Sequence, residues 1–524
     1  MMNKLLFVIY ILIVLSRSKT ANATTDSLVR WSEIQFTTTF EKNSFNRFLK
    51  ENQKDYIQLF LSNSTTAEQD FKNFKERFDN TLNEIRASDA LKKKNDKKIK
   101  YLYQLIHSRF LSKYEAENRF YEINKNGNYN CVTATALYAL FFEELDIPYA
   151  IKEEPTHVYM VAYPNADNIM IETTTPLFGF FNFDSSFKST FINNLKNQKV
   201  IGSSEATTSN MDELFNKYYF GNENITLTQL VGIHYLNDGL FRRDHNDVES
   251  GYEQIKKGYL YYPNTRSEYL MMSFIAERLE TPNVEPILRA SLIGKISRFI
   301  DKGVTIDMIK GEFYNLTQTV LSKNNDKVLY KRCYNELLLY VTNNEVAKEI
   351  SYIYNYENGR VFYNQGNYIR SKSFFANALE IQPNNVDLGG VFVSSLSQSF
   401  RNERNNKVIL DSLENYKKRF PSLEQNNNFN SMLALVYVVE FGESFEKGNS
   451  VRGEQYQKLF ENAIETNKNV NLLSPDAVGR AYSEACVYYF KKGQKPKARQ
   501  FLEKGLQLVP NDYQLKIRKQ MMGG

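Results

Sequence analysis

The fold expected for this chain depends on the stretch from Gly127 to Pro176, GNYNCVTATALYALFFEELDIPYAIKEEPTHVYMVAYPNADNIMIETTTP. Its first half holds an apolar run without Gly or Pro, and such a run at helical spacing predicts a buried helix. The residues that share one face are Ala134, Leu137, Phe141 and Leu145. Asn130 can cap the first turn, and Pro148 prevents the helix from continuing. The pattern therefore predicts a central helix that begins at Cys131.

Cys131 occupies the first position of this predicted helix. Unpaired backbone N–H groups and the helix dipole favour an anion at that end of a helix. The thiolate, which is the nucleophilic form of cysteine, is therefore favoured at Cys131.

Two β-strands should follow the helix. Residues 157–162 and 169–173 are rich in β-branched and aromatic side chains. The run Pro164–Asn168 between them has the composition of a turn, so the two strands are expected to form a hairpin.

The register of this hairpin decides which side chains meet. If the turn is centred between residues 165 and 166, His157 pairs with Thr174. Glu172 then lies on the same face as His157, at about 5–8 Å between Cβ atoms. A loop of odd length would place them on opposite faces. A nucleophile, a base and a carboxylate that orients the base are the parts needed to activate a thiol.

At these residues the chain resembles the transglutaminase-like superfamily, the permuted relatives of papain-type cysteine peptidases. The family pattern is Gly-x-Cys at a helix start, a Gly-Ile-Pro-like exit, a strand that opens with His, and a next strand that ends Asp-Pro-Thr. The corresponding segments here are Gly127–Cys131, Asp146-Ile147-Pro148, His157-Val158-Tyr159 and Glu172-Thr173-Thr174.

The resemblance covers roughly residues 95–185 and implies a thiol enzyme. By resemblance, Cys131 is the nucleophile, His157 the base and Glu172 the third member of the triad. The chain departs from the pattern in having Glu in place of Asp and a longer spacing between the glycine and the cysteine.

The alternative interpretation is that Cys131 is a small buried hydrophobic residue, as most cysteines in apolar helices are. The core would then have lost its activity, and the protein would be a scaffold that mediates protein–protein interaction. Three cysteines, Cys131, Cys333 and Cys486, cannot form a disulfide framework. Cys486 stands at a small-residue packing position, and we interpret it and Cys333 as structural.

The first residues predict export. Lys4 precedes the apolar segment Leu5–Leu15, which is followed by Ala21-Asn22-Ala23. A basic start, a short apolar core and an A-x-A end are typical of a secretory signal peptide, here residues 1–23. The alternative is an uncleaved anchor. We expect a periplasmic or secreted protein with no integral membrane segment after cleavage of the signal.

Composition excludes several classes of function. The chain is 42% hydrophobic, and its net charge of +6 comes from 66 basic and 60 acidic residues that are well mixed. This bias is too small to indicate a nucleic-acid partner. The remaining histidines, His107, His234 and His245, have no nearby Cys partners, and neither H-E-x-x-H nor C-x-x-C occurs. We therefore expect no metal and no cofactor.

From about residue 226 the pattern changes to helical hairpins. Three segments have a step of 17 from a turn residue to a Pro-Asn: Asn246 to Pro263, Gly366 to Pro383, and Gly493 to Pro510. Small and bulky residues recur at fixed offsets within them. The segments resemble the tetratricopeptide repeat, in which small residues let paired helices approach and Pro ends the second helix. The alternative is a plain α-helical domain.

These observations predict an α+β fold class. A papain-like or transglutaminase-like core, residues 95–200, is preceded by helices in residues 24–94 and followed by an α-helical, tetratricopeptide-like repeat domain in residues 226–524. Helices are expected over 43–62, 66–87 and 97–114. The motifs favour an exported cysteine hydrolase or acyl transferase that acts on amide bonds of a protein or peptide through Cys131, His157 and Glu172. The repeats would bind a protein partner.

Overall fold

The computed structural model describes residues 28–154, 156–164, 166–174, 180–181, 185–197, 201, 205, 209–219, 221, 224–466 and 474–522. The expected signal peptide, residues 1–23, lies outside these residues. The chain divides into two compact units, of which the first ends at Pro282 and the second begins at Asn283.

The predicted α+β class with a papain-like core is wrong. Helices make up 75% of the structure and strands 5%, so the chain is predominantly helical. The reason is the small amount of strand-forming sequence. Only β3 (Tyr149–Glu154) and β4 (His157–Ala162) have six residues, and the other strands described have two or three. Helices surround these short strands and supply most of the buried side chains of the first unit.

The first unit begins with helices that share one hydrophobic core with α7 (Cys131–Glu144). They are α2 (Thr39–Lys50), α3 (Tyr56–Leu61), α4 (Ala67–Ala87), α5 (Asn95–Phe110) and α6 (Phe120–Lys125), with short turns η1 (Trp31–Glu33) and η2 (Asp89–Lys92). The single helix expected over 43–62 is interrupted before Tyr56, and Asn52 within the break has a positive φ of 55°. The helix predicted over 66–87 is present as α4, with Thr66 at its N-cap.

The strands form two sheets in the described part of the chain. The larger has the order β6-β5-β4-β3-β7 and is antiparallel throughout; the smaller pairs β1 and β2 in parallel. The remaining strands are β1 (Lys113–Tyr114), β2 (Asn128–Tyr129), β5 (Ile169–Ile171), β6 (Phe180–Phe181) and β7 (Asn224–Ile225).

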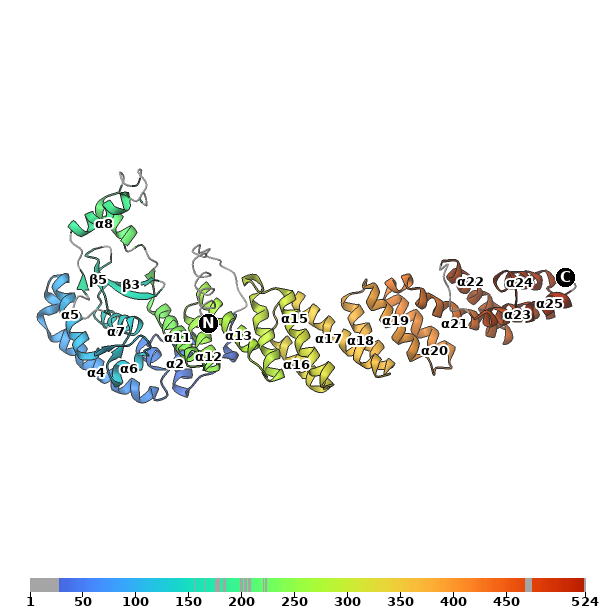
Figure 1. The fold of residues 1–524 in the computed structure, drawn as a ribbon, viewed down its shortest axis with the longest axis horizontal. Helices are drawn as coiled ribbons and strands as arrows, with labels where there is room; N and C mark the ends of the chain where they lie inside the picture. The colour runs from blue at the N-terminus through green and yellow to red at the C-terminus, as the bar shows by residue number, and fades with distance from the viewer. Residues whose placement is uncertain are drawn as a thin grey trace. The chain divides into compact units, whose positions relative to one another are not determined.

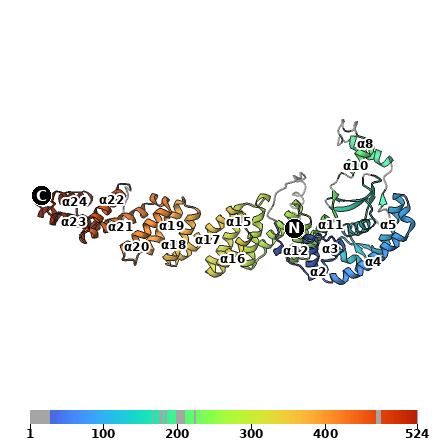
Figure 2. The same ribbon diagram turned by 180° about the vertical axis from the view of Figure 1, so that it is seen from behind.

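Alternate residues of β4 enter two different hydrophobic clusters. Val158, Met160 and Ala162 belong to the main core together with α7. Tyr159 and Val161 pack instead with side chains of α8 (Ser185–Asn197) and α10 (Met211–Tyr219). Figure 1 shows α7 on one side of the sheet and α8 on the other, and Figure 2 shows α10 beside α8. Helices therefore cover both faces of the sheet, and we expect a functional site at the ends of its strands.

Three further helices belong to the first unit, namely α11 (Leu227–Asp244), α12 (Val248–Tyr261) and α13 (Thr265–Glu280). The sequence pattern predicts them as the start of the repeat domain, residues 226–524. Gly258 lets α11 and α12 pack closely, because a Cβ added there would lie 2.8 Å from side-chain carbons of Leu236. α11 also packs against α7, and this contact brings part of the helical region next to the site.

The second unit is entirely helical in its described residues. Its helices are α14 (Pro286–Ile296), α15 (Ile306–Thr317), α16 (Lys327–Tyr340), α17 (Asn344–Asn364), α18 (Tyr368–Ile381), α19 (Val386–Ser399), α20 (Asn406–Arg419), α21 (Asn427–Glu446), α22 (Ser450–Thr466), α23 (Pro475–Lys491), α24 (Lys495–Leu508) and α25 (Tyr513–Met521), with the 3-10 helices η3 (Ser297–Lys302) and η5 (Pro421–Gln425) and the π-helix η4 (Gln318–Lys323). The three turn residues of the 17-residue segments, Asn246, Gly366 and Gly493, have positive φ values of 64°, 72° and 75° and connect paired helices.

Candidate functional site

The position of Cys131 is fixed by the start of α7. The Asn130 side chain accepts a hydrogen bond from the Thr133 N–H at 3.0 Å, and the Thr133 hydroxyl oxygen accepts one from the Asn130 N–H at 2.9 Å. The Asn130 amide also donates to the carbonyl of Ala116 at 3.1 Å, and the Thr133 hydroxyl donates to Asn118 at 2.8 Å. The helix start and the N-cap that the sequence predicts are thus both confirmed.

Cys131 differs from the other two cysteines in its exposure. It is half-buried, whereas Cys333 and Cys486 are buried. Burial raises the pKa of Cys333 to about 12 and also raises the pKa of Cys486. Buried thiols with raised pKa values are poor nucleophiles. Cys131 is therefore the cysteine best placed to react.

The hairpin register agrees with the prediction. In the ladder between β4 and β5, Met160 pairs with Ile171 and Ala162 with Ile169, which is the register centred between residues 165 and 166. Asn165 itself lies outside the described residues. This register puts His157 and Glu172 within contact, and Nε2 of His157 lies 2.8 Å from Oε2 of Glu172.

Glu172 is held by the residues that follow it. Its Oε1 accepts hydrogen bonds from the Thr174 N–H at 3.0 Å and from the Thr174 hydroxyl at 2.6 Å. Burial opposes ionisation of this carboxyl, but the hydrogen bonds with His157 and Thr174 outweigh burial and lower the pKa of Glu172. Glu172 is therefore ionised, and its Oε2 accepts a hydrogen bond from His157.

His157 lies between a thiol and a carboxylate. Its hydrogen bonds with Cys131 and, next in size, with Glu172 raise the pKa of His157 to about 10. Because Nε2 faces Glu172, Nδ1 is the nitrogen left for Cys131. The side chain of His157 is 27% exposed and that of Glu172 14%, so solvent reaches the base more than the carboxylate. The three residues named from the sequence are thus brought together.

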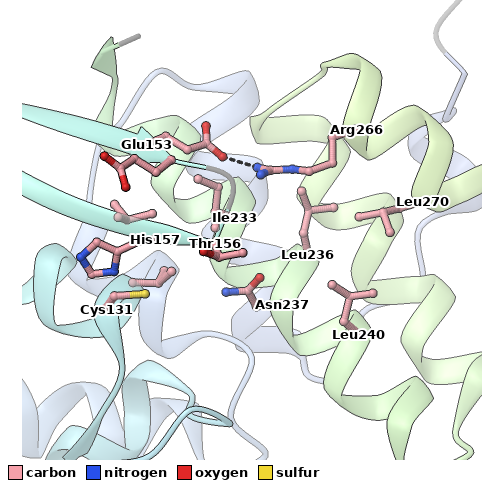
Figure 3. Close-up of a pocket in the computed structure, with 13 residues that line it drawn as sticks. Cys131, Glu153, Thr156, His157, Ile233, Leu236, Asn237, Leu240, Arg266 and Leu270 are labelled. Carbon is pink, nitrogen blue, oxygen red and sulfur yellow. Dashed lines mark hydrogen bonds and ion pairs between the residues drawn. The ribbon is translucent and has the colours of Figure 1, made fainter. Parts of the chain in front are cut away.

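A cavity of about 180 Å³ lies beside the thiol and is shown in Figure 3. Cys131 and His157 line one side of it. The opposite wall comes from α11 and α13, and its apolar members are Ile233, Leu236, Leu240 and Leu270. An ion pair between Arg266 and Glu153 lies at one end.

Asn237 is a residue of this cavity that the sequence analysis did not name. Its side chain points toward Cys131 in Figure 3 and forms no hydrogen bond with another described residue. Asn237 follows Ile233 by four residues, so it lies on the same face of α11. A polar residue within an apolar helical stripe is the sequence signal that could have identified it.

Tyr114 is a second neighbour that sequence reasoning missed. Tyr114 is 46% exposed, and partial burial first, then the nearby charges of Cys131 and Glu172, raise the pKa of its phenol. Tyr114 ends β1, which pairs with β2 immediately before α7. Only the tertiary structure brings this residue to the site, because 16 residues separate it from Cys131 in the sequence.

Within the described ranges, no group of three or more His, Cys, Asp or Glu side chains is placed to hold a metal ion. No helix in the same residues combines the length and hydrophobicity required to cross a bilayer. No family model matches the chain, and no curated protein sequence matches it.

Proposed function

We propose that the protein is a thiol hydrolase or acyl transferase that acts on amide bonds of peptides. The observation that carries this proposal is the 2.8 Å contact of His157 with Glu172, made by a histidine that lines the same cavity as Cys131. The motif resemblance to transglutaminase-like enzymes supports the same chemistry at these three residues, although the fold is predominantly helical.

In the first step, the Cys131 thiolate attacks the amide carbon and a C–S bond forms. The C–N bond then breaks, and the leaving amine takes a proton from the His157 imidazolium. In the second step, His157 removes a proton from water or an acceptor amine, which attacks the thioester and releases the thiolate. Glu172 holds the imidazole in one orientation and stabilises its cationic form.

The tetrahedral intermediate of each step carries an oxyanion that needs hydrogen-bond donors. The N–H of Cys131 is one donor, because the first backbone N–H groups of a helix have no partner within the helix. We propose the side-chain amide of Asn237 as the second donor, since it faces the sulfur across the cavity.

The proposal is tested by measuring the hydrolysis of a mixed peptide library together with thiol labelling of the folded protein by iodoacetamide near pH 7. We expect Cys131 to be labelled at least 10-fold faster than Cys333 and Cys486, and Cys131→Ala to abolish hydrolysis. Cys486→Ala serves as the matched control and should retain activity. Equal labelling of the three cysteines in folded protein contradicts the proposal and favours the inactive scaffold.

We also propose that the helices of the second unit bind a protein partner and that the protein is exported. The specific observation for binding is a surface cavity of about 800 Å³ lined by α21 and by polar and charged residues near Arg404 and Lys407. Acidic and basic side chains both line this cavity, which suits a polar protein surface better than a polyanion. Affinity capture with the wild-type protein and with Lys407→Glu tests whether this surface binds a protein partner.

N-terminal sequencing of the mature protein tests whether the signal peptide is removed on export.

A further inference from the structure

We infer that the cavity beside Cys131 binds an apolar side chain of the acyl group, of about the size of leucine, so that the enzyme cleaves or transfers after such residues. This inference rests on the proposed thiol chemistry and names its substrate class.

The lining of the cavity is predominantly apolar. Six of its residues carry only hydrocarbon side chains: Val132, Val158, Ile233, Leu236, Leu240 and Leu270. Leu236 is 2% exposed and is backed by Gly258 of α12, so this part of the wall is held in place by packing. Leu240 and Leu270 are half-buried and lie where an incoming side chain would cover them.

Two charged groups of the cavity, Arg266 and Glu153, neutralise one another, and Glu154 is a further carboxylate in the lining. Arg266 pairs with Glu153, and the hydroxyl of Tyr262 donates to the same carboxylate at 2.7 Å. An acidic side chain would face the carboxylates of Glu153 and Glu154, and a side chain of either charge would have to leave water, which is costly. A neutral apolar side chain has no charge hydration to lose on entering the cavity.

The size of the cavity sets the size of the occupant. Its volume is about 180 Å³. An apolar cavity of about 150 Å³ in another protein accommodates benzene, so leucine, methionine or phenylalanine fits here. Glycine would leave the cavity unfilled, and each missing methylene in an apolar subsite lowers kcat/KM roughly 10-fold or more.

The arrangement of the site indicates which part of the substrate enters the cavity. The leaving amine must lie near His157, since it receives its proton from the imidazole. The apolar wall of α11 and α13 lies across the cavity from His157 (Figure 3). The side chain that reaches this wall therefore belongs to the residue whose carbonyl is attacked.

The test uses acetyl-Ala-Ala-X chloromethyl ketones with X = Gly, Leu, Asp or Lys on the full chain. Cys131 displaces chloride and forms a C–S bond, which mass spectrometry maps. We expect the Leu reagent to react at least 10-fold faster than the other three. Iodoacetamide, which has no side chain to place, is the reference reagent.

The indole of Leu270→Trp should fill the cavity. The ratio of the rate with the Leu reagent to the rate with iodoacetamide should therefore be at least 10-fold lower in this variant than in the wild type. Met272→Trp is the matched control, because Met272 is half-buried on the same helix but does not line the cavity. Its selectivity should equal that of the wild type.

The outcomes separate the two proposals. Equal rates for the four reagents with normal iodoacetamide labelling overturn the substrate class and leave the thiol chemistry intact. Absence of labelling by iodoacetamide and by all four reagents in folded protein overturns both. An unchanged preference for leucine in Leu270→Trp overturns the assignment of this cavity.

Discussion

Nε2 of His157 lies 2.8 Å from Oε2 of Glu172, whose other oxygen accepts two hydrogen bonds from Thr174. The two hydrogen bonds from Thr174 therefore hold the carboxylate in position for its contact with the imidazole. This contact commits Nε2 and leaves Nδ1 for Cys131, so one carboxylate sets the orientation of the base relative to the thiol.

The first prediction concerns the role of Glu172. Glu172→Ala should lower turnover about 10²-fold yet leave it measurable, because the thiolate and the oxyanion donors remain. Glu172→Gln should also be impaired, since it keeps the shape but lacks the charge that stabilises the imidazolium. Cys131→Ala should be inactive. Steady-state kinetics, with melting curves to exclude misfolding, check all three. Wild-type turnover in Glu172→Ala would reduce the site to a Cys–His dyad.

The second prediction concerns pH. The folded pKa of His157 is raised to about 10, so its protonation stabilises the fold fully below its unfolded pKa near 6.5 and loses this effect as pH rises through about 10. The folded pKa of Glu172 is lowered, so its ionisation stabilises the fold above pH about 4.5 and loses this effect as pH falls. Both contributions are present together between about pH 4.5 and 6.5.

Glu172→Gln should therefore lose the most stability in that window, on the order of 1 kcal/mol after allowing for solvent screening. The difference from wild type should shrink toward pH 10 and toward strong acid. Thermal melts across the pH range measure this difference. A difference that stays constant with pH would show that Glu172 and His157 do not interact as ions.

Much of the candidate site follows from short-range sequence signals. Asn130 and the apolar run after it determine where α7 begins, and this places Cys131. The loop between β4 and β5 has an even number of residues, which fixes the shared face of His157 and Glu172. Each of these features depends on one helix start or on one hairpin loop, so a local pattern is enough to predict it.

The rest of the site depends on contacts between distant segments. Asn237 reaches the cavity because α11 packs against α7, and Leu270 lies on α13, which packs against α12; no local pattern reports this packing. The fold class was mispredicted for a related reason. Strand propensity identified the hairpin, but it did not show that the surrounding chain is so largely helical that the short strands form a minor part of the fold.

The third prediction concerns Asn237. Asn237→Ala should lower kcat about 10²-fold with little change in KM, because an oxyanion donor acts on the transition state more than on the bound substrate. Alkylation of Cys131 by iodoacetamide forms no oxyanion, so its rate should be the same in the variant. A parallel loss of alkylation and hydrolysis would instead assign Asn237 a role in placing the thiol.

The last prediction concerns the division of the chain. Tyr235 of α11 hydrogen-bonds Ser62 at 2.8 Å and Glu41 at 3.2 Å, and Lys257 of α12 is paired with Glu41 at 2.9 Å. Lys257 and Glu41 are almost completely buried. Removing one partner of such a buried pair costs roughly 3–5 kcal/mol. A fragment that begins at residue 226 therefore keeps Lys257 but loses its partner.

Residues 283–524 expressed alone should consequently give a helical circular dichroism spectrum, one cooperative melt and little binding of a hydrophobic dye. Residues 226–524 should show the same melt but bind more dye, because the faces of α11 that the first unit buries become exposed. The pair of fragments differs only in α11–α13 and the residues next to them, so each serves as the control for the other. A single cooperative melt of 226–524 at a higher temperature, without dye binding, would instead assign α11–α13 to the second unit.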